Sequence, residues 1–234
     1  MRVLVIGGSG RVGTGVLPFL VKDHDIRVFD VRQPQVSGAA YLAGTVLDCD
    51  ALASAMNGVD GLIYMAMNRE FDEFTEACDV NVRGIYYALD AARKVGLTHV
   101  VHTSTGSVHN ERAVKCFDDE RLPLEAWHAY GLTKGMGEMV CEYFARLHGM
   151  SVIALRLFGP CAHESWLEDW RRHGRSGLTT FSDTARAFDL ALNSSAHQGY
   201  DAAFISGDHT GQIVNCDKAK RLLGWEPLDR FEQG

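Results

Sequence analysis

The sequence lacks the cysteine and histidine spacings that hold structural metals. Its six cysteines are scattered and form no CxxC pair, and its ten histidines form no HExxH motif. Zinc sites in proteins usually show such spacings, so no metal is expected. Scattered cysteines also fit reduced thiols in a reducing compartment, which predicts a cytoplasmic protein.

Long apolar runs and strong positive charge are also missing. The opening residues, MRVLVIGG, turn glycine-rich after a few apolar positions, which is too short for a signal peptide or a membrane span. The formal net charge is -7, and basic residues gather only in WRRHGR at 170–175. We therefore expect neither a membrane nor a nucleic-acid partner. An anionic small substrate would need a local positive group of its own.

What is present is a regular alternation of strands and helices. The 234 residues, 46% of them hydrophobic, can bury one core. Short apolar runs predict strands over 2–6, 26–30, 40–43, 61–66, 151–158 and 202–206, and a strand that runs into a small-residue loop over 98–107. Helical spacing predicts helices over 11–21, 50–56, 71–95, 125–148, 182–192 and 217–223.

This alternation predicts an α/β fold, a doubly wound parallel sheet. We expect residues 1–158 to form a dinucleotide-binding domain. The pattern loosens after Phe158, so residues 159–234 are expected to form a small substrate-binding appendage on the carboxyl edge of the sheet.

The segment GGSGRVG, at 7–13, places glycines three residues apart between the first strand and the first helix. Glycine permits a tight turn and lets backbone N–H groups approach a pyrophosphate at the positive end of a helix. Asp30 closes the second strand about twenty residues later, where a carboxylate accepts hydrogen bonds from an adenosine ribose. Together they predict dinucleotide binding. The carboxylate favours NAD, while Arg11 and Arg32 leave NADP open.

Tyr130 and Lys134 lie one helical turn apart in AYGLTKG, at 129–135. The loop HTSTGS, at 102–107, follows the fifth strand, so the hydroxyls of Ser104 and Thr105 are expected to meet the tyrosine. A tyrosine pKa near 10 is too high for a base at neutral pH, but the Lys134 ammonium and an oxidised nicotinamide would favour the phenolate. Tyr130 would then accept the proton of a substrate alcohol while Thr105 orients the oxygen. In the alternative interpretation, Tyr130 and Lys134 are two solvent-exposed helix residues beside a polar loop, without a catalytic role.

The ordered motifs GGSGRVG, FD at 29–30, NVRG at 81–84, the TST loop, YGLTK and LLGWEP at 222–227 resemble the extended short-chain dehydrogenase/reductase superfamily, and within it the NAD-dependent epimerase/dehydratase family. The resemblance implies a Rossmann fold, a Ser/Thr–Tyr–Lys catalytic set of Thr105, Tyr130 and Lys134, and a homodimer formed by the two long helices. Asn81 would hold the catalytic loop or a relay water, or serve as a core amide. The cofactor-binding residues it implies are Gly7, Gly10, Arg11, Val12, Gly13, Asp30, Arg32, Thr45, Val46, Met65, Ala66 and Lys134.

Three positions depart from the family pattern. Thr45 stands where relatives carry an aspartate facing the adenine, although Val46 can still pack on the base. Relatives usually carry the sequence HLA at the end of the fourth strand, where this chain has YMA at 64–66. The backbone of this segment should still run beside the cofactor. Gly159 replaces an asparagine that often holds the diphosphate of nucleotide sugars.

The short segment after Gly159 indicates a small ligand, and the layout is most similar to the uronate dehydrogenases, which oxidise a free hexuronic acid with NAD. That resemblance implies a carboxylate clamp at Arg175 and substrate contacts at Ser104, Gly106 and Ser107. Gly106 and Ser107 replace the Asn-His pair of those enzymes, and Arg171 and Arg172 compete with Arg175. Three hypotheses remain: a dehydrogenase of a small sugar or sugar acid, a nucleotide-sugar epimerase or dehydratase with tightly held NAD, and a dinucleotide-sensing protein without turnover.

Overall fold

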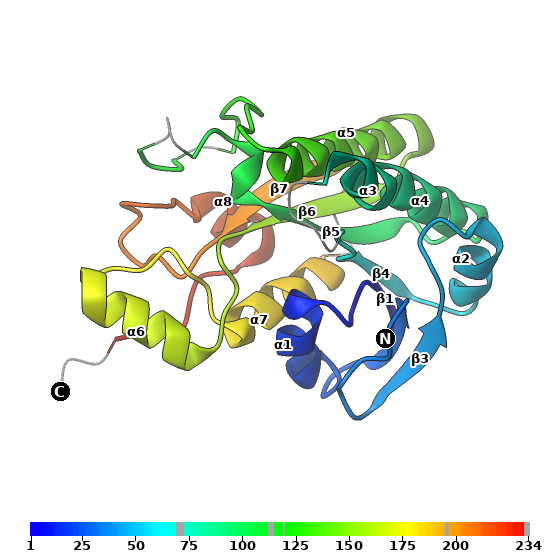
Figure 1. Cartoon of the computed structure of the whole chain (residues 1–234), viewed down its shortest axis with the longest axis horizontal. Helices are drawn as coiled ribbons and strands as arrows, with labels where there is room; N and C mark the ends of the chain where they lie inside the picture. The colour runs from blue at the N-terminus through cyan, green and yellow to red at the C-terminus, as the bar shows by residue number, and fades with distance from the viewer. Residues whose placement is uncertain (69–72, 112–114, 119, 195–196, 232–234) are drawn as a thin grey trace.

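The strands that can be described all lie in one parallel sheet, in the order β3-β2-β1-β4-β5-β6-β7 (Figure 1). The computed structural model describes residues 1–68, 73–111, 115–118, 120–194 and 197–231. The strands are β1 (Arg2–Ile6), β2 (Asp25–Asp30), β3 (Ala39–Ala43), β4 (Gly61–Tyr64), β5 (His99–Thr105), β6 (Ser151–Leu157) and β7 (Tyr200–Ile205). The order reverses between β1 and β4, which is where doubly wound sheets bind their ligands.

Helices cover both faces of this sheet. The α-helices are α1 (Arg11–Leu20), α2 (Cys49–Ala55), α3 (Phe74–Cys78), α4 (Ile85–Lys94), α5 (Ala129–His148), α6 (His163–His173), α7 (Phe181–Leu192) and α8 (Asp217–Leu223). Helices α1, α7 and α8 share a core with one face, and α2, α4 and α5 with the other. The fold predicted from the sequence is confirmed.

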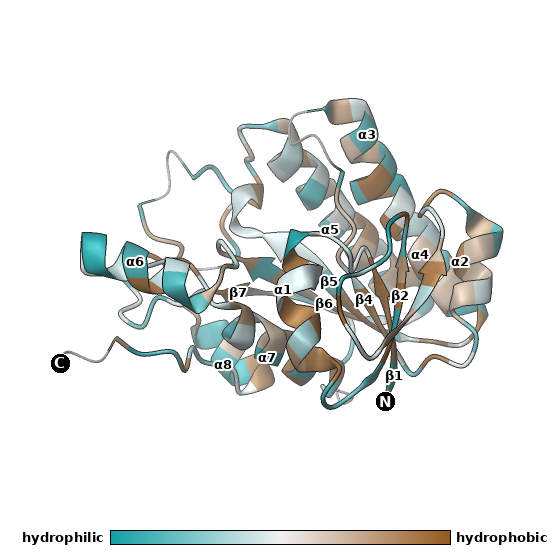
Figure 2. Cartoon of the chain, turned by 60° about the horizontal axis from the view of Figure 1, so that its bottom comes forward, coloured by the Kyte–Doolittle hydropathy of each residue, from teal (hydrophilic) through white to brown (hydrophobic). Residues whose placement is uncertain are grey.

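Burial on both faces explains why the central strands are almost entirely apolar. Every residue of β4 and β6 is buried, and Figure 2 shows hydrophobic colour along β1, β2 and β4. A parallel strand covered by helices on both sides has no solvent-facing side chains to alternate. The apolar runs of the sequence therefore located these strands.

The predicted helix over 71–95 is not continuous. Residues 71 and 72 lie outside the described part of the chain, Glu73 caps α3, and a π-helical turn over Asp79–Gly84 separates α3 from α4. The Tyr64 hydroxyl donates to the carbonyl of Val80 at 2.6 Å, so a side chain from the sheet competes for this backbone. Such turns arise where side chains insert into the helical ladder.

Two further predictions about helices were wrong in detail. Helix α5 begins at Ala129 rather than Glu125, because His128 caps it by accepting from the N–H of Gly131 at 2.9 Å. Helix α6 was missed, since its sequence HESWLEDWRRH buries only Trp166 and shows little apolar periodicity.

The carboxyl ends of the last strands carry loops that join one another. The loop after β5 pairs with the loop after β7 through a parallel bridge between Phe117 and Val214, and the loop after β6 pairs with the start of α7 through Cys161 and Thr180. Strand β7 extends the sheet beyond β6, so residues after 158 contribute to the sheet as well as to its edge. The division at residue 158 stays a prediction.

Candidate functional site

The glycine loop follows β1 and is too tight for side chains. Gly7 has a φ of +84°, and a Cβ there would lie 2.3 Å from the backbone nitrogen of Ala66. A Cβ on Gly13 would lie 2.1 Å from the carbonyl oxygen of Gly8. Gly10 precedes α1 without any side-chain cap, so the first N–H groups of this helix are left for another acceptor. This cradle fits the pyrophosphate of a dinucleotide.

Asp30 lies beside the glycine loop, as predicted. Its two carboxylate oxygens accept the backbone N–H groups of Ser9 at 2.9 Å and Arg32 at 3.0 Å. Each oxygen retains a second lone pair, so the carboxylate can also accept ribose hydroxyls. The Arg32 side chain is exposed, and Arg11 donates to the carbonyl of Pro160 at 3.0 Å.

The remaining cofactor candidates line the switch point between β1 and β4. Met65 and Ala66 are buried after β4, and the N–H of Met65 donates to Ile6 at 2.8 Å. Val12 is half-buried in the first turn of α1. Thr45 is exposed and Val46 is buried, as expected if the valine packs at the adenine end. The residues present therefore fit NAD along this edge of the sheet.

Tyr130 and Thr105 are brought together at the end of β5. The Thr105 side chain forms a hydrogen bond with the phenol and also accepts the N–H of Ser107 at 3.2 Å. Tyr130 is half-buried in the first turn of α5. Thr105 and Tyr130 thus occupy the geometry in which a hydroxyl and a phenol can share one substrate oxygen.

Lys134 lies one turn further along α5 and is only 2% exposed. Its ammonium donates to the carbonyl of Thr103 at 2.8 Å. Burial lowers the pKa of Lys134 to about 8, partly opposed by the nearby Cys141 and Glu138. Two of its three donor positions remain for other acceptors, such as the hydroxyls of a nicotinamide ribose.

The expected effect of Lys134 on Tyr130 needs correction. The pKa of Tyr130 is raised, first because burial disfavours the phenolate and also because of the negative charge of Glu111, while the hydrogen bond with Thr105 lowers it. Lys134 is not among these causes, since its ammonium is directed at the Thr103 carbonyl. The positive charge of an oxidised nicotinamide, when bound beside the phenol, would favour the phenolate further.

Ser104 does not meet the tyrosine, contrary to the prediction. Its side chain is buried and donates to Glu138 on α5 at 2.5 Å. Glu138 lies eight residues after Tyr130 on the same helix, so the Ser104 hydroxyl is directed at α5 but away from the phenol. Ser104 therefore belongs to a buried network, and its contact with substrate stays a prediction.

This network was missed by the sequence analysis. Glu138 accepts from Arg156 of β6 through two bonds, at 2.9 and 2.7 Å, and from the Tyr200 hydroxyl at 2.9 Å. Arg156 also donates to the carbonyl of Glu120 at 2.7 Å. The buried ion pair thereby ties the loop that leads to the catalytic helix onto the sheet.

Asn81 and His102 are buried beside Lys134. The Asn81 amide donates to the Thr133 hydroxyl at 3.0 Å and to Asn68 at 3.4 Å. Among the described residues, neither ring nitrogen of His102 nor the side-chain oxygen of Asn81 has a protein partner. Buried polar atoms of this kind usually bind internal water.

The other substrate candidates divide into two groups. Gly106 and Ser107 directly follow Thr105, and a Cβ on Gly106 would strike the Phe158 ring at 2.4 Å, so only glycine fits there. Arg175 follows α6, is exposed, and forms no ion pair or hydrogen bond with any residue that can be described. The structure shows no contact between Arg175 and the catalytic residues.

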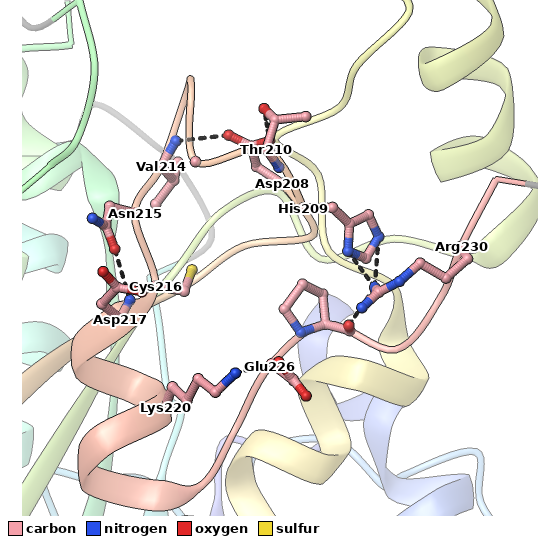
Figure 3. A pocket seen from close by; sticks show the side chains of 12 residues that line it. Asp208, His209, Thr210, Val214, Asn215, Cys216, Asp217, Lys220, Glu226 and Arg230 are labelled. Atoms are coloured by element: carbon pink, nitrogen blue, oxygen red, sulfur yellow. Dashed lines mark hydrogen bonds and ion pairs between the residues drawn. The ribbon is translucent and has the colours of Figure 1, made fainter.

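A separate cavity of about 370 Å³ lies between the β7–α8 loop and the segment after α8 (Figure 3). Asp208 organises this loop, and Lys220 pairs with Glu226 at 2.9 Å. None of the predicted site residues lines the cavity. Within the described ranges there is no metal-binding group of histidine, cysteine and acidic residues, and no helix has the length and apolarity to cross a bilayer.

The chain is similar to known proteins over most of its length. An L-arabinose 1-dehydrogenase (NAD(P)(+)) from Haloferax volcanii is 29% identical over 254 residues, covering 97% of this chain and 96% of that protein. A uronate dehydrogenase from Pseudomonas syringae pv. tomato is 24% identical over 82% of this chain and 69% of its own length. A short-chain dehydrogenase/reductase superfamily protein from Agrobacterium tumefaciens, solved with bound NAD, shares the fold with a TM-score of 0.83 at 21% identity, over 98% of this chain and 93% of its own. Residues 3–175 match one family throughout, and the chain therefore belongs to the NAD dependent epimerase/dehydratase family and is an NAD-dependent enzyme.

Proposed function

We propose that the enzyme transfers a hydride between a small sugar or sugar acid and NAD, with Tyr130 as the acid/base. The hydrogen-bonded pair of Thr105 and Tyr130, beside Lys134 at the carboxyl edge of the sheet, carries this proposal. The sugar dehydrogenases among the relatives support the substrate class. The six cysteines are all free thiols, which supports a cytoplasmic location.

Each catalytic residue has one task in the oxidation. Thr105 orients the sugar hydroxyl, and Tyr130 accepts its proton as the carbon–hydrogen bond breaks. NAD, when bound, supplies the acceptor for the hydride. Lys134 would donate to the nicotinamide ribose, while the Thr103 carbonyl holds the ammonium in place. The products are a carbonyl compound, reduced cofactor and one proton.

Net reduction of NAD by free sugars tests this function directly. Pentoses, hexoses, polyols and hexuronates are to be offered with NAD or NADP while the absorbance of the reduced nicotinamide is followed. We expect turnover with at least one free sugar, and faster turnover with NAD because the Asp30 carboxylate repels a 2′-phosphate. Conversion of a UDP-sugar without net NADH would instead indicate an epimerase or dehydratase.

The helices α4 and α5 carry an exposed apolar stripe, which supports a homodimer. Met139 and Leu147 are 63% and 52% exposed, and Tyr86 and Tyr143 are 42% and 38% exposed. The helices α4 and α5 pack against each other on one side of the sheet (Figure 1). Contiguous apolar patches of this kind commonly mark subunit interfaces.

Met139→Glu is expected to convert this dimer into a monomer, because a carboxylate would be buried without a partner at the interface. Light scattering after size-exclusion chromatography measures the mass directly. Leu228→Glu is the matched control, since Leu228 is 58% exposed and lies after α8. A wild-type chain that is monomeric at micromolar concentration would contradict the proposal.

A further inference from the structure

A carboxylate lies beside the catalytic pair, and the proposed function gives it no task. Glu111 follows the β5 loop, and its Oε1 accepts a hydrogen bond from the Ser107 hydroxyl. The N–H of Ser107 in turn donates to Thr105, which bonds to Tyr130. Two hydrogen bonds therefore connect Glu111 to the threonine that orients the substrate oxygen.

The charge of Glu111 is not neutralised by a cation in the described part of the chain. Its carboxylate is exposed and forms no ion pair there. The Lys134 ammonium, on α5, is buried and donates to Thr103. The Nδ1 of His128 accepts the backbone N–H of Gly131. Among the described residues, the charge that acts on the Tyr130 phenol is therefore the negative one of Glu111.

We infer that Glu111 determines substrate specificity by binding the hydroxyls of neutral sugars and rejecting sugar acids. A carboxylate accepts hydrogen bonds from sugar hydroxyls and makes stronger ones than a neutral acceptor does. A substrate carboxylate in the same place would meet like charge, which suppresses binding. This inference rests on the proposed function and narrows its substrate class to uncharged aldoses and polyols. It disfavours the carboxylate clamp at Arg175.

The same charge has a second effect that can be measured separately. Burial and the negative charge of Glu111 raise the pKa of Tyr130, against the hydrogen bond from Thr105. In the described part of the chain, the phenol is faced by Thr105 from β5, by Glu111 from the loop and by His128, the cap of its own helix. Removing the charge of Glu111 should therefore move the pH dependence of sugar oxidation, which requires the phenolate, to lower pH.

Glu111→Gln tests the inference with the matched ligands D-galactose and D-galacturonate, which differ only at carbon 6. Binding is measured by calorimetry on protein saturated with NAD and carrying Tyr130→Phe, so that no turnover interferes. With Glu111 present, galactose should bind more tightly. Glu111→Gln should shift the ratio of the two dissociation constants by about tenfold toward galacturonate, which corresponds to about 1.4 kcal/mol.

Glu125→Gln is the control, because Glu125 is an exposed carboxylate of the same loop. In this variant the ratio of the two dissociation constants should stay unchanged. Tighter binding of galacturonate with Glu111 in place, or a ratio unaffected by Glu111→Gln, would overturn the inference and leave the sugar dehydrogenase intact. Binding of neither ligand, with no turnover of any free sugar, would overturn the proposed function and the inference together.

Discussion

Tyr130→Phe is expected to lower turnover by about 10²–10⁴-fold, the usual contribution of a positioned acid/base. The change removes only the phenolic oxygen, which is the group that bonds to Thr105. The ring and its contact with His128 remain, with ring centroids 5.9 Å apart. Cofactor affinity should stay within a factor of about three, since no contact with the glycine loop is lost.

The measurement combines steady-state kinetics with a titration of NAD by intrinsic fluorescence. Tyr143→Phe is the matched control, because Tyr143 lies on the same helix and is 38% exposed. That variant should retain wild-type turnover. Unchanged activity of Tyr130→Phe would remove the tyrosine from the mechanism, and lost NAD binding would indicate a structural role instead.

Local motifs account for most of what the sequence could predict. The glycines of 7–13 and Asp30 lie near one another because a strand, a turn and a second strand follow in short succession, and the structure joins them through Ser9. Tyr130 and Lys134 are one helical turn apart, so their common placement required only a helix. Such short-range geometry is fixed by backbone periodicity.

Contacts between segments that lie far apart in the chain could not be predicted from the sequence. Glu138 and Arg156 are eighteen residues apart, on α5 and β6, and nothing in their spacing indicates an ion pair. The direction in which the Ser104 side chain points also depends on the register of β5. A shift of one residue in a strand moves every side chain to the opposite face of the sheet. Glu111 was not among the residues that the sequence singled out. Its significance comes from the fold of its loop against Thr105.

Glu138→Ala should be the most destabilising of these substitutions. Glu138 is 2% exposed and Arg156 is 4% exposed, so truncation leaves a guanidinium buried without its partner. Breaking a buried pair in this way typically costs about 3–5 kcal/mol. The hydroxyls of Ser104 and Tyr200 would lose their acceptor as well. Urea denaturation measures the loss in the free energy of unfolding.

Two comparisons separate charge burial from a simple loss of contacts. Glu168→Ala breaks the exposed pair with Arg172 and should leave the midpoint of unfolding unchanged, because solvent screens such pairs. The double variant Glu138→Leu, Arg156→Met should recover most of the stability lost in Glu138→Ala, since apolar replacements remove both charges together. If the double variant is less stable than Glu138→Ala, the ion pair itself, and not the cost of an unpaired charge, holds the catalytic helix against β6.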